Sequence, residues 1–455
     1  MTTIMSWHKR KILWGSWLLL SFTCLPVQAQ QDTVYSFSLK EAQDHAVQYN
    51  LTVKTSRKDL EHANQQIKQF LATGLPQVNS NLNYQDNLVL RTTLMPDFIH
   101  GNPDNKIPVQ FGSQHTADFG VGVSQMVFNG PFIVGLEATK ILRKLNEQNV
   151  VKTETDIRET VARTYYLVLL GRKTAGVIEE NLRNMKKTLE DTRKMYEAGF
   201  TDDIAVDQLQ VSVTSLENAV KSAWRQVAAS ERLLKFQMGL DLDTPIRLTD
   251  SLDNLIAAID VPSIMVKPFR LDSQIEYQVA STREELAAIN LKKEKFMYMP
   301  TINANYMNQW SAMRNTFSFF DPNEKWYHSS FLGISVAIPI FSSGMRKANV
   351  GMRRIELEKA SINKELLSEN LQLQYQQARD ALITAWENFQ AQQKNVELAR
   401  KVVDKTRVKV SLGTASSLDL TQVNNQYLDT QTRYFTAMIE LLKAKIHLDR
   451  MLNQL

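Results

Sequence analysis

The sequence predicts an α+β protein in which a unit made of a helix, two β-strands and a long α-helical hairpin occurs twice in tandem. Two long windows, residues 132–244 and 340–455, contain no proline. Because a proline inside a helix costs about 3 kcal/mol, such windows can hold very long helices. The segments in front of both windows alternate apolar and polar residues with a period of two, which is typical of strands.

The two units align with each other in sequence. Residues 180–239 match residues 394–453 at an offset of 214, so that Gly199 falls on Gly413. Upstream, Pro76 falls on Pro300 at an offset of 224, so the first unit holds about ten extra residues between its strands. Recurrence of the same features in the same order indicates a tandem repeat.

A single glycine divides each proline-free window. Gly199 and Gly413 stand where a left-handed residue can end one helix before the next begins. We therefore expect one helical hairpin over residues 129–239 with its tip near 199, and another over residues 342–455 with its tip near 413. A helix from about residue 132 to 198 would be on the order of 100 Å long, which suits a spacer better than a catalytic domain.

Each unit should open with a shorter helix. Ser38 and Glu41 form a capping-box pattern, which predicts one helix running to about residue 73 within the segment 30–75. The second opening helix, at 271–299, lacks so clear a cap. Three prolines between the units predict an inter-repeat linker over residues 240–270.

The first 29 residues have the pattern of a secretory signal peptide. A basic stretch at 9–11 precedes an apolar run and the small-residue cleavage site at 27–29. An uncleaved anchor helix is the alternative, but the run is short against the roughly 20 residues that span a membrane. Cys24 is the single cysteine, and Phe22 and Thr23 fit a lipidation site poorly. Cleavage would therefore leave no thiol for a disulfide, a metal site or catalysis.

The charge balance and the absence of known motifs argue against a nucleic-acid-binding protein and against an enzyme. The chain has 53 basic and 48 acidic residues, and without residues 9–11 the balance is 50 against 48. A nucleic-acid partner would need clustered positive charge. The seven histidines are scattered, Gly120 and Gly122 lack the rest of a nucleotide loop, and no nucleophile or Walker motif occurs. We expect no enzyme activity, no cofactor and no metal site.

Four strands are expected, two in each of the segments 76–128 and 300–341, at about 78–85, 117–128, 301–310 and 331–341. One face of each strand is apolar and the other is polar or small, as in transmembrane β-barrels. A soluble antiparallel sheet with one solvated face is the alternative. On the barrel interpretation, the polar rows face the lumen, and they contain Asn79, Asn81, Asn83, Asn303 and Asn305.

Four strands cannot close into a barrel, and an open sheet edge in lipid leaves backbone groups without partners. Oligomerisation is therefore expected. A dimer would make an eight-stranded barrel filled by its own side chains, which would not use the polar faces. A trimer with twelve strands fits better.

The order of elements and several local motifs resemble the TolC-like outer membrane efflux proteins. The similar residues are Ser38-Leu39-x-Glu41-Ala42, Leu75-Pro76, Phe128-Asn129-Gly130, Phe341-Ser342-Ser343-Gly344 and Gly413 followed by Leu418-Asp419-Leu420. This resemblance implies a homotrimeric, passive tunnel: a twelve-stranded barrel in the outer membrane lipid continued by a periplasmic α-helical barrel. It also implies an efflux or secretion role with a periplasmic adaptor protein and an inner-membrane pump, and places residues 91–110 and 317–326 outside the cell.

The resemblance suggests roles for residues at the hairpin tips. Members of the family commonly narrow the entrance with acidic side chains, and Asp419 and Gln422 occupy the corresponding positions here. The family's aromatic and basic latch positions correspond to Val410 and Ala415, so no latch is expected. Asp202 and Asp203 receive no role, since acids are favoured at any helix start. The expected adaptor contacts are Tyr196, Gly199, Phe200, Leu412 and Gly413.

Two other functions remain open from sequence. One is a structural periplasmic coiled-coil protein with a small soluble sheet. The other is an outer membrane pore that works without a pump. The exported substrate and the class of pump are not specified by any motif, and Asp419 could instead be an ordinary acid in the first turn of a helix.

Overall fold

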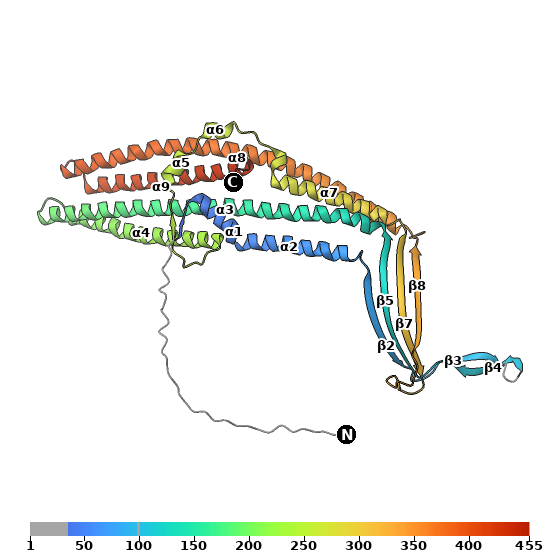
Figure 1. Ribbon diagram of the computed structural model, residues 1–455. Helices are drawn as coiled ribbons and strands as arrows, with labels where there is room; N and C mark the ends of the chain where they lie inside the picture. Colours follow the sequence, from blue (N-terminus) through green and yellow to red (C-terminus); the bar gives the residue numbers. More distant parts are fainter. Residues whose placement is uncertain (1–34, 98–100, 455) are drawn as a thin grey trace, which may run out of the picture.

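The computed structural model describes residues 35–97 and 101–454, so the predicted signal peptide and Cys24 lie outside the described residues. The chain forms a long helical arm and a narrow sheet that leaves one end of the arm at a steep angle (Figure 1). Two helical hairpins, one from each repeat, lie side by side along the arm. None of the described helices combines the length and the apolar character needed to cross a membrane.

The two hairpins contain the longest elements of the fold. The first is α3 (Gly130–Glu197) followed by α4 (Asp203–Met238), and the second is α8 (Met345–Ser411) followed by α9 (Ser417–Met451). The chain reverses at Gly199 and Gly413, whose φ angles of 78° and 71° lie in the left-handed region that favours glycine. At 1.5 Å per residue, the 68 residues of α3 span about 100 Å.

The opening of the first repeat differs from the single predicted helix. A short strand, β1 (Tyr35–Phe37), precedes α1 (Leu39–Tyr49) and α2 (Leu51–Ala72). The helix breaks at Asn50, which has an extended ψ of 135° and whose Oδ1 accepts the backbone N–H groups of Thr52 and Val53. Asparagine competes with the helical backbone in this way, and it therefore ends α1 and caps α2 together.

The corresponding helix of the second repeat is α7 (Ile275–Phe296), preceded by a 3-10 turn, η1 (Leu271–Ser273). The predicted start at residue 271 is therefore four residues early. The N-cap residue of α7, Gln274, makes no side-chain bond to the helix start; its Nε2 instead donates to the Met451 carbonyl at 2.8 Å. This buried bond ties the start of α7 to the end of the chain.

The sheet has four antiparallel strands in the order β2-β5-β7-β8. They are β2 (Gln77–Asp86), β5 (His115–Asn129), β7 (Thr301–Arg314) and β8 (Tyr327–Ala337). The predicted third strand is four residues too short at its end. The predicted fourth strand is displaced by four residues, because Ala337 already pairs with Thr301, the first residue of β7, and Pro339 beyond it has no N–H to donate.

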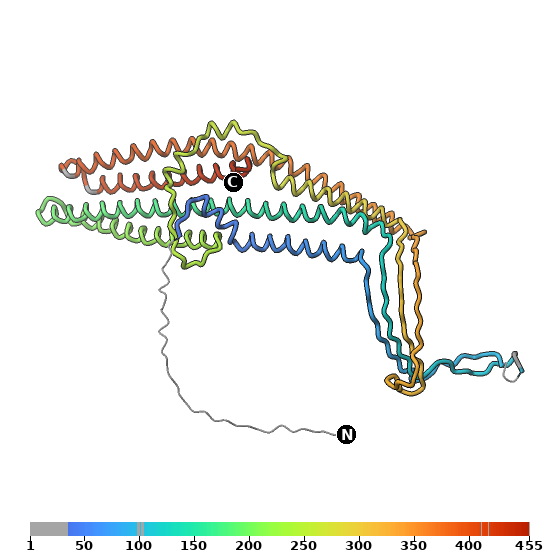
Figure 2. The backbone as a smooth tube through the Cα atoms, in the orientation of Figure 1, coloured from blue at the N-terminus to red at the C-terminus, as the bar shows by residue number. Residues whose placement is uncertain are grey.

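A second, unpredicted hairpin lies beyond the far end of the sheet. It consists of β3 (Thr92–Asp97) and β4 (Asn102–Gln110), and it projects away from the arm (Figure 2). No strands were predicted for residues 91–110, which the family resemblance places outside the cell. The region contains three prolines, and an isolated two-stranded hairpin tolerates them because both of its strands are edges.

The inter-repeat segment 240–270 is not a plain linker. It contains β6 (Ile246–Leu248), which pairs in parallel with β1, and two short helices, α5 (Leu252–Ala257) and α6 (Val261–Met265). Apolar residues of all three elements join the main core in the middle of the arm. The fully buried Tyr165 anchors this core, since its hydroxyl lies 3.0 Å from the Phe37 carbonyl and 2.9 Å from Asp250 Oδ2.

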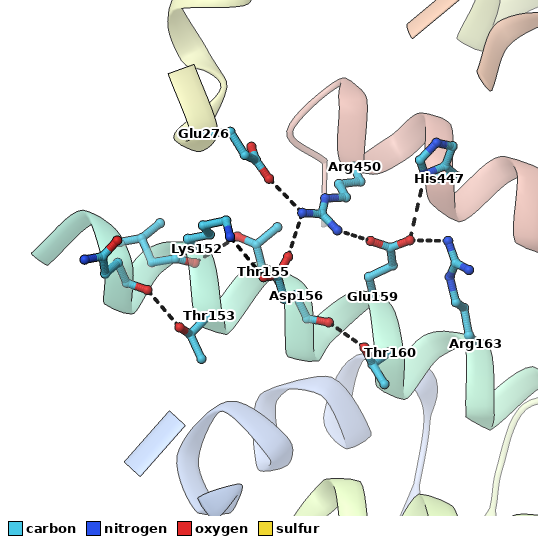
Figure 3. Close-up of polar contacts among 12 residues, drawn as sticks. Lys152, Thr153, Thr155, Asp156, Glu159, Thr160, Arg163, Glu276, His447 and Arg450 are labelled. Carbon is cyan, nitrogen blue, oxygen red and sulfur yellow. Dashed lines mark hydrogen bonds and ion pairs between the residues drawn. The ribbon is translucent and has the colours of Figure 1, made fainter. Parts of the chain in front are cut away.

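A cluster of charged side chains joins the two repeats beside this core (Figure 3). Arg450 on α9 contacts Glu159 at 2.5 Å, Asp156 at 2.6 Å and Glu276 at 2.7 Å. Glu159 also pairs with Arg163. We call these five residues the Arg450 cluster. Burial alone would raise the pKa of Glu159, but the neighbouring His447, the hydrogen bond from Arg450 and the nearby positive charges lower it to about 2.

Candidate functional site

The first hairpin tip is held by backbone bonds that leave its apolar side chains exposed. The Gly199 N–H donates to the Tyr196 carbonyl at 2.9 Å, and the Phe200 N–H donates to the Met195 carbonyl at 2.8 Å. The exposed fractions of Tyr196 and Phe200 are 46% and 79%. The first tip therefore exposes two aromatic side chains at the end of the arm.

The second tip repeats this geometry. The Gly413 N–H donates to the Val410 carbonyl at 3.0 Å, and the Thr414 N–H donates to the Lys409 carbonyl at 2.9 Å. Leu412 is 71% exposed. Each tip therefore presents an apolar side chain next to a glycine with positive φ.

A groove of about 380 Å³ lies between the two tips. It brings together residues that are about 200 positions apart in the sequence, because the repeats place the hairpins side by side (Figure 2). Val410 and Ala415, where no latch is expected, also line it. From the first tip it is lined by Met195, Phe200 and Ile204, and from the second by Gly413, Ser416 and Leu418.

Asp419 takes part in the N-terminal cap of α9. Its Oδ2 accepts the Ser416 N–H at 2.9 Å and the Ser416 hydroxyl at 2.8 Å, and its own N–H donates to Ser416 Oγ at 3.1 Å. These bonds from Ser416, the backbone bond foremost, lower the pKa of Asp419. Asp419 is thus a capping residue and also an ionised group on the exposed surface, with Gln422 exposed one turn further along. Asp202 caps α4 in a similar way, since its Oδ1 accepts the Ala205 N–H at 3.0 Å.

The other candidate surface is the polar face of the sheet. Residues that pair directly in register share a face of a sheet. Asn79, Asn81 and Asn83 pair with Gly122, Gly120 and Asp118 of β5, and the β5–β7 register continues this face to Asn303 and Asn305. The structure therefore brings the five predicted asparagines onto one face, which is hollowed around Asn79, Asn81 and Asn305.

The opposite face is apolar and exposed. Leu82 of β2 is 72% exposed, and Leu332 and Ile334 of β8 are 77% and 72% exposed. Near the far end of the sheet, Phe319 folds back onto Ala117 and Ala312 of this face. An exposed apolar face of this extent requires a cover, which lipid or another protein surface would supply.

Asp118 was not among the predicted site residues, although the alternation of polar and apolar residues along its strand placed it on the polar face. Its Oδ1 accepts bonds from Ser311 Oγ at 2.5 Å and from Gln309 Nε2 at 3.1 Å. The signal available in the sequence was a lone acid within a strand of small and apolar residues. Within residues 35–97 and 101–454, no three His, Asp or Glu side chains lie together in a way that could hold a metal ion.

Comparison with known proteins identifies the family. The family model described as outer membrane efflux protein matches residues 43–240 and 274–454, which is most of the chain. The chain belongs to the outer membrane efflux protein family. It is therefore a transport protein of the outer membrane, with a large periplasmic portion made of the helical arm. The family consists of channels, not of enzymes.

Curated members of the family are distant in sequence. The outer membrane efflux protein BepC of Brucella suis is 20% identical over 335 residues, which cover 72% of this chain and 70% of BepC. The cation efflux system protein CusC of Escherichia coli K12 is 21% identical over 307 residues, 64% of each chain. The alignment with CusC thus spans less than two thirds of that protein.

Solved structures of outer membrane channels share the fold. A crystal structure of CusC superposes with a TM-score of 0.72 at 17% identity and covers 91% of both chains. The outer membrane protein VceC from Vibrio cholerae gives a TM-score of 0.70 at 14% identity, covering 91% of this chain and 95% of VceC. The α+β, TolC-like fold implied by the sequence resemblance is thereby confirmed.

Proposed function

We propose that three copies of this efflux protein form the outer membrane exit duct of a tripartite efflux or secretion system. The observation that carries the proposal is the four-stranded sheet, which has edge strands β2 and β8, one polar face and one exposed apolar face. Pairing β8 of one copy with β2 of the next would close twelve strands, satisfy the edges and put the apolar face against outer membrane lipid. The polar face would then line the lumen.

The helical arm continues this duct across the periplasm. Three copies would bring twelve helical segments into a ring, and the six tips would form the entrance. Transport through such a duct is passive, and the chain needs neither a cofactor nor catalytic residues for it. A periplasmic adaptor and an inner-membrane pump would supply the substrate and the energy.

The tips are the proposed adaptor contact. The groove between them is lined by both apolar and polar side chains of the two repeats, Phe200 among them. Phe200 is 79% exposed, and Leu412 of the second tip is 71% exposed. Burying such side chains removes apolar surface from water, which favours association by about 25 cal/mol per Å² before the entropic costs of binding are subtracted. An adaptor with an apolar, hairpin-like end would fit this groove.

Asp419 is the proposed charge of the entrance. A trimer would place three Asp419 carboxylates on the helices that surround the opening, with Gln422 one turn further in. The Ser416 cap keeps this carboxyl ionised and fixes its orientation. The Asp419→Asn variant should therefore raise the single-channel conductance or weaken the preference for cations, and unchanged currents would exclude this role.

The native mass of the protein extracted in detergent from outer membranes tests the proposal most directly. Three chains per particle and stepwise conductance in planar bilayers are expected. A monodisperse monomer would rule out the shared barrel. Release of the protein by salt alone would instead support a structural periplasmic protein.

A pair of variants tests the tips. Phe200→Ser combined with Leu412→Ser should abolish efflux in cells while the trimer mass and conductance stay unchanged. Leu94→Ser is the matched control, since Leu94 is 64% exposed but lies on the β3–β4 hairpin at the other end of the molecule. Normal efflux by the tip variant would favour a pore that works without a pump.

A further inference from the structure

The polar face of the sheet carries a single charged side chain. The registers of β2, β5, β7 and β8 show which described residues lie on this face. All of them except Asp118 are uncharged: they are asparagine, glutamine, serine, threonine, glycine and a few apolar residues. Asp86, His115 and Arg314 belong to the opposite face. The electrostatic character of the polar face therefore depends on one carboxylate per chain.

The surroundings of Asp118 fix this carboxylate in place. Ser311, its direct partner on β7, donates to Oδ1 at 2.5 Å, and Gln309 donates to the same oxygen at 3.1 Å and to Ser311 Oγ at 3.2 Å. Both donors are neutral, so they hold this side chain in place without bringing an opposite charge to it. No donor of the described residues reaches Oδ2, so this oxygen remains available to solutes at the polar face.

Among the residues of the sheet that the structure describes, no neighbouring position holds a cation that could compensate the charge. Gly120, the next residue of this face on β5, is covered by neutral side chains: a Cβ there would lie 2.9 Å from Asn81 Oδ1 and 3.0 Å from Met307 Cε. Arg314, the nearest arginine along β7, lies on the other face, where it stacks over Phe319 at 5.2 Å. Within the described part of the chain, Asp118 thus has hydrogen-bond partners but no ion-pair partner.

We propose that Asp118 sets the charge preference of the barrel, so that the channel passes cations more readily than anions at this level. The inference rests on the proposed function, in which the polar face lines the lumen. Asp118 stands three residues from the start of β5, at the end of the sheet remote from the helical arm. Three copies would put three carboxylates at one level, and rings of acidic side chains favour cations in channels. This site is separate from the entrance at Asp419.

The reversal potential of the purified trimer in planar bilayers under a KCl gradient tests this assignment. Asp118→Asn keeps the shape and the hydrogen bonds to Ser311 and Gln309 but removes the charge. The ratio of K⁺ to Cl⁻ permeability should fall by about twofold or more at 0.1 M salt, where the screening length is about 10 Å, and the effect should vanish near 1 M, where it is about 3 Å.

Asp86→Asn is the matched control, because it removes a carboxylate from the apolar face, three residues along β2 from Asn83, the register partner of Asp118. It should leave the reversal potential at the wild-type value. Equal reversal potentials for wild type and Asp118→Asn would overturn the inference while the channel function stands. An equal shift in Asp86→Asn would overturn the assignment of the polar face to the lumen, and absence of wild-type conductance would overturn the channel proposal itself.

Discussion

Replacing Arg450 by methionine removes the cation that holds three carboxylates together between the two repeats. Arg450 contacts Glu159, Asp156 and Glu276, and the side chains of Arg450 and Glu159 are only 24% and 7% exposed. Removing one partner of a buried ion pair costs about 3–5 kcal/mol. The pKa of Glu159, lowered from 4.5 to about 2, corresponds to roughly 3 kcal/mol of stability at neutral pH, which agrees with this range.

The assay is thermal unfolding of the detergent-solubilised protein, followed by circular dichroism at one scan rate. An unfolding entropy of about 2.1 cal/mol/K per residue converts 3 kcal/mol into a fall of roughly 3 °C in the midpoint for a chain of this size. Arg183→Met is the matched control. Arg183 forms an exposed pair with Glu179 at 3.8 Å, and loss of such a pair should shift the midpoint by under about 1 °C.

The pH dependence has a defined sign. Since the pKa of Glu159 is lower in the folded protein, its stabilisation is fully present above about pH 4.5 and is lost as the pH falls toward about 2. The difference between wild type and Arg450→Met should therefore shrink across this interval. Equal midpoints for Arg450→Met and Arg183→Met at pH 7 would refute the reasoning, and so would a difference that stays constant down to pH 3.

Two further substitutions test the packing of the arm, both by the same unfolding measurement. Gly239→Ala should lower the free energy of unfolding by roughly 2–5 kcal/mol, because the φ of 72° disfavours a side chain and the new Cβ would lie 2.4 Å from the Tyr49 carbonyl oxygen. Gly413 has a similar φ but open space around it, so Gly413→Ala should lower it by only about 1–2 kcal/mol. Asn50→Ala should lower the free energy of unfolding by about 2 kcal/mol, because it removes the cap of α2 and the 2.7 Å hydrogen bond from Asn50 Nδ2 to the Gln237 carbonyl. A loss below about 0.5 kcal/mol would show that the helix break forms without this side chain.

Several features of this protein follow from local sequence patterns. Gly199 and Gly413 end long proline-free helices, and the alternation around Asn79 and Asn303 assigns the faces of the strands. These signals are local because helix caps and strand periodicity depend on neighbouring residues. The strand ends were predicted less well, since Ala337 ends β8 only because its partner strand begins at Thr301.

The β1–β6 pair, the groove between the tips and the Arg450 cluster could not be predicted in this way. β1 is too short to be recognised alone, and it becomes a strand because Ile246–Leu248 lies beside it more than 200 residues later. Asp118 had a predicted face but no predicted partners, because Ser311 and Gln309 come from the other repeat.

The sequence by itself determined the repeat, the lengths and turns of the hairpins and the polarity of the two faces of the sheet, because these depend on the order and spacing of neighbouring residues. Tertiary structure alone decided which residues meet. Arg450 reaches Asp156 and Glu276 because the end of α9 packs between α3 and α7. Contacts over such separations depend on the packing of whole helices, which no local pattern records.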